Sequence, residues 1–204
     1  MLRLIAILDY GLGNLRSVSN ALKRLNAQIK VSSNKRALVQ ADAIVVIGVG
    51  EFGEAMSNLR PFKDTIVEQL EKGIWYFGIC VGYQILFTGS EESSATEGLG
   101  ILDGFVKRFP KGITTPHIGW NQLENIDKKC PFFKNINEHS FVYFMHSYYP
   151  VIKDKSIIAA STEHKIKFAS AVWHRNIFAT QFHPEKSGKV GLRILRNFIE
   201  VVKR

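Results

Sequence analysis

The chain has 204 residues, of which 46% are hydrophobic and 22% are charged, and its formal net charge is +9. This length and composition suit one globular domain over residues 1–204, large enough to bury roughly 70% of its unfolded surface without disulfide or metal staples. The basic residues are scattered pairs without interleaved aromatic residues, which argues against nucleic-acid binding and indicates a solvated surface, with attraction of an acidic protein partner as the alternative.

The first apolar run is Leu4 to Leu8, and it predicts a buried strand. Asp9 and Gly11 stop this run too early for a signal peptide, and no segment approaches membrane-spanning length. The chain has two cysteines, too few to suggest a disulfide framework, and Cys130 has no base motif near it. We therefore expect a cytoplasmic protein.

A helix is expected from about Asn14, after the turn Gly11-Leu12-Gly13. Its apolar residues fall on one stripe, which consists of Leu15, Val18, Leu22 and Leu25. The turn is not a G-x-G-x-x-G motif and lacks the lysine of a P-loop, so a nucleotide is not expected there.

Strands and helices then alternate on short connections. Strands are expected at Ile29–Ser32 and Ala43–Ile47, with a short helix around Lys35–Gln40 between them. This alternation predicts an α/β fold with a doubly wound, mostly parallel central sheet. Two amphipathic stretches broken at Pro61 follow, and their core residues are Phe52, Met56, Leu59, Phe62, Ile66 and Leu70.

The most informative stretch runs from Ile74 to Gln84. A buried strand is expected at Ile74–Phe77, ending at Gly78, and it leads into Gly78-Ile79-Cys80-Val81-Gly82. This G-x-C-x-G pattern is typical of a nucleophile elbow with sulfur in place of oxygen, since the glycines permit a sharp turn that exposes the central side chain. A helix expected over Tyr83–Phe87 would aim its amides at the thiol. The alternative is a strand end with an inert cysteine.

A base and a group to orient it occur near the other end of the chain. His183 and Glu185 follow the strand-like run Ile177–Thr180. Cys80 as nucleophile, His183 as base and Glu185 as the orienting carboxylate would form a catalytic triad. If the chain stays extended through Pro184, the side chains of His183 and Glu185 point the same way.

The carbonyl attacked by a thiolate becomes an oxyanion, which needs N–H donors. The elbow offers the backbone N–H of Val81, and the loop Gly48-Val49-Gly50 at the neighbouring strand end offers a second donor at Val49.

With these motifs the sequence resembles the class I glutamine amidotransferases, and specifically the glutaminase subunits of imidazole glycerol phosphate synthase. The resemblance spans nearly the whole chain and is carried by D-Y-G-L-G-N-L-R-S-V at 9–18, G-V-G-E-F-G-E-A-M at 48–56, G-I-C-V-G-Y-Q at 78–84, P-H-I-G-W-N at 116–121, Y-F-M-H-S-Y at 143–148 and Q-F-H-P-E-K-S at 181–187. It implies a flavodoxin-like sheet and hydrolysis of L-glutamine to glutamate and ammonia. It further implies a heterodimer with a separate (β/α)8-barrel cyclase, which uses the ammonia to form imidazole glycerol phosphate and an aminoimidazole ribonucleotide (AICAR) in histidine biosynthesis. No cofactor or metal is implied.

The resemblance also assigns roles to further residues. The glutamine-binding residues would be Gly48, Gly50, Gln84, His146, Ser147 and Tyr148. The residues at the interface with the cyclase would be Asn14, Trp120, Asn121 and Tyr143. One position departs from the family pattern, because Ile47 stands where proline is usual before G-V-G; isoleucine restores one N–H and adds backbone freedom beside the oxyanion amide.

The rest of the chain is expected to extend the sheet. A polar segment at 89–100 marks a loop at the rim of the site, and we assign no chemistry to its Glu91, Glu92 or Glu97. Antiparallel strands are expected at Gly104–Phe109, Phe141–Tyr149, Ile157–Thr162, Phe168–Trp173 and Ile177–Thr180. The last helix is expected to begin after Ser187 as its N-cap and to bury Val190, Ile194, Leu195, Phe198 and Val202.

Three other interpretations stay open. The chain could be a paralogous glutaminase that feeds a different synthase, such as one making amidino sugars for the cell surface. It could hydrolyse γ-glutamyl peptides alone. It could also be a non-catalytic subunit that binds and regulates a barrel enzyme.

Overall fold

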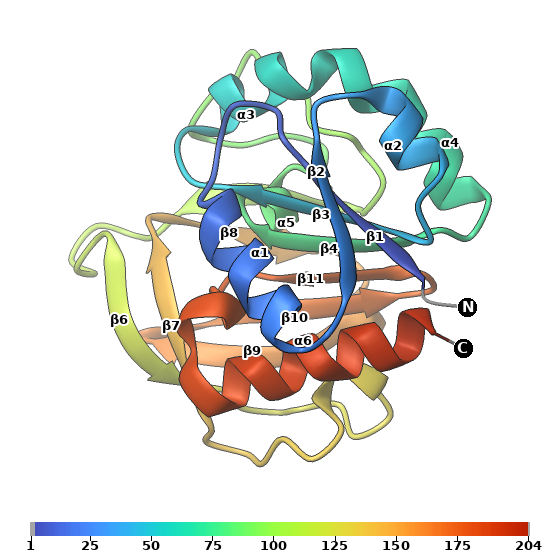
Figure 1. The fold of residues 1–204 in the computed structure, drawn as a ribbon. Coiled ribbons are helices and arrows are strands. Elements are labelled where there is room, and N and C mark those ends of the chain that lie inside the picture. The colour runs from blue at the N-terminus through green and yellow to red at the C-terminus, as the bar shows by residue number, and fades with distance from the viewer. Residues whose placement is uncertain (1–2, 204) are drawn as a thin grey trace.

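The computed structural model describes residues 3–203, and its centre is a seven-stranded sheet in the order β2-β1-β3-β4-β11-β10-β9 (Figure 1). Met1 and Leu2, ahead of the first expected strand, and Arg204 lie outside the described residues. The five strands from β2 to β11 pair in parallel, whereas β10 pairs antiparallel with both β11 and β9. The expected mostly parallel sheet with an antiparallel extension is thus confirmed.

The strands of this sheet are β1 (Leu4–Leu8), β2 (Gln28–Ser32), β3 (Ala43–Gly48), β4 (Trp75–Cys80), β9 (Ile158–His164), β10 (Ile166–His174) and β11 (Ile177–Thr180). Two smaller sheets pair β5 (Gly104–Arg108) with β8 (Tyr148–Ile152), and β6 (His117–Gln122) with β7 (Phe141–His146). The helices are α1 (Leu15–Arg24), α2 (Lys35–Val39), α3 (Phe52–Leu59), α4 (Lys63–Glu71), α5 (Val81–Gln84) and α6 (Gly188–Val202). Short 3₁₀ turns are η1 (Arg60–Phe62), η2 (Pro131–Phe133), η3 (Lys155–Ile157) and η4 (Pro184–Lys186).

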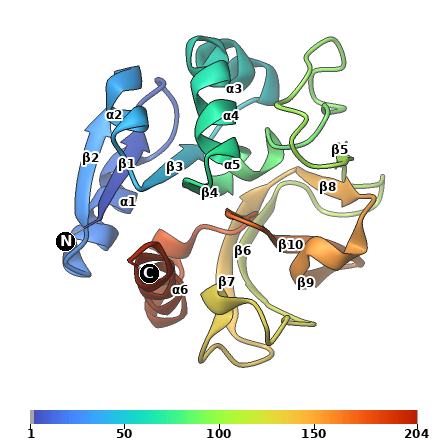
Figure 2. The same ribbon diagram turned by 90° about the vertical axis from the view of Figure 1, so that its right-hand side faces the viewer.

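Helices cover both faces of the parallel part of the sheet, as Figures 1 and 2 show. On one face α1 packs beside α6, and on the other face α2 packs beside α4. The apolar stripes expected from the sequence point inward: Val18 and Leu22 are fully buried in α1, and Ile194 and Phe198 are fully buried in α6. Burial on both faces explains why β1 and β3 are continuous apolar runs rather than alternating ones.

The segment from α3 to α4 confirms the expected break at Pro61. Pro61 stands in η1, where its missing N–H costs no helical hydrogen bond. All six apolar residues expected in the core here are buried, namely Phe52, Met56, Leu59, Phe62, Ile66 and Leu70. Among residues 3–203, none of the helices is both long enough and apolar enough to cross a membrane.

The expectation of one continuous strand at Phe141–Tyr149 is wrong, because this segment forms two strands. The chain breaks at Ser147, so β7 pairs with β6 while β8 pairs with β5 in another sheet. Similarly, Ile177–Thr180 is not only part of the antiparallel extension, because β11 also pairs in parallel with β4. Both features bring the segments after β7 and after β11 to the carboxyl end of β4, where Tyr148 contacts Gln84 and Gln181 contacts Cys80.

Candidate active site

The backbone at Cys80 has the strained conformation of a nucleophile elbow. Strand β4 continues to Cys80 and does not end at Gly78 as expected, and Cys80 itself has φ +55° and ψ −107°. A left-handed φ at a residue with a side chain costs of order 1–3 kcal/mol and persists only where the surroundings enforce it. The turn holds the sulfur at the carboxyl edge of the parallel sheet, where α/β folds place their sites.

Two glycines allow this turn because other backbone atoms approach them closely. A Cβ on Gly82 would lie 1.9 Å from the Val46 carbonyl oxygen, and a Cβ on Gly78 would lie 2.4 Å from the Gly82 carbonyl oxygen. The same Gly82 carbonyl accepts a 2.7 Å hydrogen bond from the buried hydroxyl of Tyr76. Gly82 therefore allows the turn to pack closely against β3, and Gly78 allows the turn to pack against the end of its own strand.

The helix after the elbow is shorter than the sequence indicated. It covers Val81–Gln84, a single turn, rather than Tyr83–Phe87. The helix therefore begins directly after Cys80, two residues earlier than expected, so its first N–H groups follow the sulfur-bearing residue.

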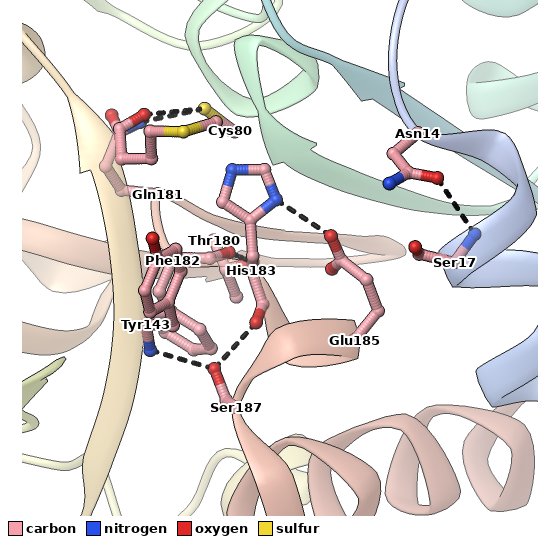
Figure 3. Close-up of polar contacts among 11 residues, drawn as sticks. Asn14, Ser17, Cys80, Tyr143, Thr180, Gln181, Phe182, His183, Glu185 and Ser187 are labelled. Carbon is pink, nitrogen blue, oxygen red and sulfur yellow. Dashed lines mark hydrogen bonds and ion pairs between the residues drawn. The ribbon is translucent and has the colours of Figure 1, made fainter. Parts of the chain in front are cut away.

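His183 and Glu185 lie beside this elbow and contact each other. The Nδ1 atom of His183 is 2.9 Å from Oε1 of Glu185, and both side chains are fully buried (Figure 3). The expected contact is present, but the extended chain that we expected to produce it is not, since residues 184–186 form the 3₁₀ turn η4. Burial lowers the pKa of His183, but the negative charges available to Cys80 and Glu185 on either side outweigh burial and raise the pKa to about 10.

Ser187 holds the backbone of His183 in place. Its hydroxyl donates to the His183 carbonyl oxygen at 2.6 Å and accepts from the Tyr143 N–H at 3.0 Å, while the His183 N–H donates to the Tyr143 carbonyl at 2.9 Å (Figure 3). Ser187 precedes α6 as expected, but its side chain does not cap the helix. The serine instead ties the histidine turn to β7.

Two hydrogen-bond contacts of the Cys80 sulfur are found among residues 3–203. It lies 3.8 Å from the Met145 carbonyl oxygen, to which the thiol donates, and 3.7 Å from Nε2 of Gln181. The Nε2 atom of His183 faces the Cys80 side in Figure 3 and, within the described residues, is buried with no hydrogen-bond partner. A thiol, a free imidazole nitrogen and an orienting carboxylate are thus adjacent, which is the arrangement needed for nucleophilic attack with proton transfer to histidine.

A cavity of about 220 Å³ opens over the sulfur. This is below the range of about 300–1,000 Å³ usual for drug-sized ligands, so the cavity suits a small metabolite. Its lining includes both expected oxyanion residues and five of the six expected glutamine-binding residues: Val49, Val81, Gly50, Gln84, His146, Ser147 and Tyr148. Gly48, the sixth, does not line it; it pairs with Cys80 across β3 and β4.

Glu92 also lines this cavity, although no role was expected for it. Its Oε2 atom accepts a 2.8 Å hydrogen bond from the Phe52 N–H. Burial raises the pKa of Glu92, the Phe52 N–H opposes this, and the nearby Glu51 adds to it. Nothing in the local pattern distinguishes Glu92 from Glu91 or Glu97; only the folded loop brings it to the cavity.

The expected oxyanion loop follows β3 directly. Gly50 has φ +128°, a conformation that favours glycine. A Cβ on Gly48 would lie 2.4 Å from the hydroxyl of Tyr10, so glycine is required there by the approach of this phenol. Over the described part of the chain the Tyr10 hydroxyl is buried without a partner, and burial, followed by the charge of Cys80, raises its pKa.

Both ring nitrogens of His146 already have protein partners. Nδ1 lies 2.8 Å from the Tyr148 carbonyl oxygen and must donate to it, so Nε2 is an acceptor, 3.0 Å from Nδ1 of His117. Burial lowers the pKa of His146 to about 3 and that of His117 to about 4, in keeping with two neutral rings. The His146 ring therefore supports the cavity wall through Tyr148.

The four expected interface residues differ in what they contact. Trp120 is 55% exposed and meets the Tyr143 ring edge to face, with centroids 6.1 Å apart. Asn121 faces the other side of the β6–β7 ribbon and donates to the Glu163 carbonyl at 2.8 Å. Asn14 is the N-cap of α1, its side chain accepting from the Ser17 N–H at 3.1 Å (Figure 3).

Comparison with known proteins gives this arrangement a family. The model of "Glutamine amidotransferase class-I" matches residues 6–202. The imidazole glycerol phosphate synthase subunit HisH of Methanocaldococcus jannaschii is 45% identical, covering 98% of this chain and 100% of the relative. The same subunit of Pyrococcus furiosus is 47% identical, and the match covers 95% of this chain and 97% of the relative. PurLQS from Thermotoga maritima shares the fold, with a TM-score of 0.77 at 19% identity over 98% of this chain and 99% of that one.

The fold and the elbow with its neighbouring histidine are those of a class I glutamine amidotransferase, and the family model covers nearly the whole chain. The closeness of the full-length relatives narrows this class further. The chain belongs to the family of the imidazole glycerol phosphate synthase subunit HisH, and it is an enzyme. The resemblance noted from the sequence motifs is thereby confirmed.

Proposed function

We propose that this chain hydrolyses L-glutamine to glutamate and ammonia with Cys80, His183 and Glu185 as a catalytic triad. The observation that carries the proposal is the strained Cys80, whose sulfur opens into a small cavity with a buried His183–Glu185 pair beside it. Among residues 3–203, Cys80 is the one cysteine that lines this cavity.

The reaction balances with these groups alone. The raised pKa of His183 favours the state in which the proton of the Cys80 thiol has moved to Nε2 of His183, and in this state the thiolate attacks the side-chain carbonyl carbon of glutamine. The resulting oxyanion would be held by the N–H groups of Val81 and Val49. His183 then protonates the leaving nitrogen, ammonia departs, and water attacks the γ-glutamyl thioester, passing its proton back through His183 to the sulfur. Glu185 keeps Nδ1 protonated throughout.

Substrate recognition would use charges that match an amino acid. The half-buried carboxylate of Glu92 suits the α-ammonium group, and the placement of Ser147 and Tyr148 where β7 gives way to β8 suits hydrogen bonding to the α-carboxylate. Gln84 would use its Oε1, since Nε2 is engaged by the Tyr148 carbonyl and Gln181. Gly48 and Gly50 would shape the loop over the substrate.

Ammonia would pass to a partner subunit. The relatives are named as subunits of imidazole glycerol phosphate synthase, and we propose a heterodimer with a (β/α)8-barrel cyclase that forms imidazole glycerol phosphate and AICAR for histidine biosynthesis in the cytoplasm. An apolar surface supports a docking face on the β6–β7 ribbon, where Ile118, Trp120 and Phe141 are each more than half exposed. Trp120 and Tyr143 would be its anchors, with Asn14 at its margin and Asn121 bracing the ribbon from inside.

Reconstitution with the purified cyclase tests this function. Glutamine should then support formation of imidazole glycerol phosphate, and free ammonia should replace glutamine only at high concentration. If ammonia supports the cyclase but glutamine with this chain does not, the partner belongs to another pathway and the paralogous synthase is favoured. Turnover of γ-glutamyl peptides without any partner would favour the stand-alone hydrolase.

A further inference from the structure

The side-chain amide of Gln181 donates a hydrogen bond to the sulfur of Cys80. It follows β11, is fully buried, and places Nε2 3.7 Å from Sγ (Figure 3). The other polar contact of the sulfur, the Met145 carbonyl at 3.8 Å, is an acceptor and favours the protonated thiol. The Gln181 amide, as a donor, therefore favours the thiolate, whereas the Met145 carbonyl favours the protonated thiol.

The orientation of the Gln181 amide follows from its neighbours. The Tyr148 carbonyl can only accept, so the Gln84 atom 3.0 Å from it must be the nitrogen Nε2. The same Nε2 lies 3.1 Å from Gln181, whose facing atom must then be the oxygen Oε1. This leaves Nε2 of Gln181 facing Sγ. The chain of contacts thus excludes the flipped amide, which would set an oxygen against the sulfur.

The anchor of this chain is itself fixed. His146 donates from Nδ1 to the same Tyr148 carbonyl at 2.8 Å. Two donors from separate elements therefore converge on one carbonyl oxygen, and Gln84 and Gln181 are both buried, at 3% and 0% exposure. Buried amides with satisfied partners do not rotate freely, so the donor is aimed at the sulfur before substrate binds.

We propose that Gln181 stabilises the thiolate of Cys80 through an N–H···S⁻ hydrogen bond, with Gln84 holding its amide in the donating orientation. The proposal rests on the proposed role of Cys80 as nucleophile. When the thiol proton moves to His183, the sulfur can no longer donate a hydrogen bond to the Met145 carbonyl, and it becomes negatively charged. The hydrogen bond from Gln181 to the sulfur is then charge-assisted. When the sulfur attacks the substrate carbon, this charge leaves the sulfur for the oxyanion, so Gln181 acts on the resting nucleophile.

The test measures the sulfur without any turnover of glutamine. The rate of Cys80 alkylation by iodoacetamide is followed against pH in the full-length chain by peptide mass spectrometry. Cys130 does not interfere, since the peptides differ and burial raises its pKa to about 12. Gln181→Met keeps the side-chain length and removes the donor, and Gln181→Glu places acceptors at the sulfur. Gln69→Met is the matched control, a buried glutamine in α4 at 2% exposure.

The pH of half-maximal alkylation should rise by about one unit in Gln181→Met, a tenfold loss of thiolate on the acid side, and by more in Gln181→Glu. Gln69→Met should leave it unchanged. An unchanged pH profile in folded Gln181→Met or Gln181→Glu, or an equal shift in Gln69→Met, overturns the proposal. Glutaminase activity that survives Cys80→Ala would instead overturn the proposed function, so the two failures are distinguishable.

Discussion

His183 and Glu185 share a 2.9 Å hydrogen bond between Nδ1 and Oε1, although neither side chain reaches solvent. The remaining polar atom of each side chain, Oε2 of Glu185 and Nε2 of His183, is buried without a hydrogen-bond partner in the described chain. The pair is therefore held together while one nitrogen is kept free on the sulfur side. This relationship has consequences for stability as well as for proton transfer.

Glu185→Gln should destabilise the protein most at low pH. The pKa of His183 in the folded state, about 10, lies above the ordinary value of 6.5, so the stabilisation from its charged form is complete below 6.5 and is lost as the pH rises through 10. The Glu185→Gln substitution removes the carboxylate that favours the charged form of His183. Urea unfolding of both proteins should show a difference in unfolding free energy near about pH 6 that shrinks toward about pH 10. A difference that is constant across this range would show that the charge on His183 does not contribute.

Gly82→Ala should be far more damaging than Gly53→Ala. The new methyl group at position 82 would meet the carbonyl oxygen of Val46 at 1.9 Å, and backbone in the centre of the sheet cannot move away. We expect a loss of roughly 3 kcal/mol or more, or no soluble protein. At position 53, within α3, the methyl group meets the movable Ser93 hydroxyl, and alanine has the better helix propensity by about 1 kcal/mol. Equal melting temperatures for the two variants would contradict this account of the elbow.

Tyr10→Phe should keep or raise stability, because it deletes a buried hydroxyl that lacks a partner among residues 3–203. The expected change is about 1 kcal/mol in the stabilising direction. Tyr76→Phe is the matched comparison, since its hydroxyl donates to the Gly82 carbonyl at 2.7 Å and its loss leaves that oxygen unpaired. We expect Tyr76→Phe to cost about 1–2 kcal/mol in chemical unfolding. Destabilisation of Tyr10→Phe to the same extent would reveal a hydrogen bond at Tyr10.

Trp120→Ala should weaken binding of the cyclase by about 2 kcal/mol or more while leaving the melting temperature of the isolated chain nearly unchanged. The side chain is 55% exposed, so its truncation removes little packing within this chain. Val39→Ala is a suitable control, since Val39 is 53% exposed and belongs to α2 rather than to the β6–β7 ribbon. Titration calorimetry with the cyclase compares the two. Equal affinities would move the docking face away from the ribbon.

The sequence was most informative where one local pattern decides the structure. The continuous apolar run of β1 and the stripe of α1 have the spacing of their elements, and both lie where we expected them. Gly78 misled because glycine usually ends a strand, whereas here it admits the Gly82 carbonyl and the strand continues to Cys80. The break between β7 and β8 at Ser147 is not marked by a glycine or proline, so the sequence around it is typical of one continuous strand.

The site was predictable only where a motif marks it. Cys80 and His183 stand in recognisable patterns, although η4 rather than an extended chain brings Glu185 to the histidine. Glu92 had no such signal, and the motif at 181–187 contains Gln181 but indicated no role for it. The Phe52 N–H that holds Glu92 is 40 residues away in sequence, and the contact between Gln181 and Cys80 spans 101 residues, so only the packed fold brings these groups together.

The role of Cys80 is tested by the initial rate of glutamate formation from glutamine by the reconstituted complex with Cys80 and with Cys80→Ala. Size-exclusion chromatography checks that both forms bind the cyclase equally, because Cys80 lies in the cavity rather than on the exposed ribbon. If Cys80 is the nucleophile, the variant complex should be intact and its rate should be lower by about four orders of magnitude or more. A rate within about tenfold of the unmodified complex would contradict Cys80 as the nucleophile.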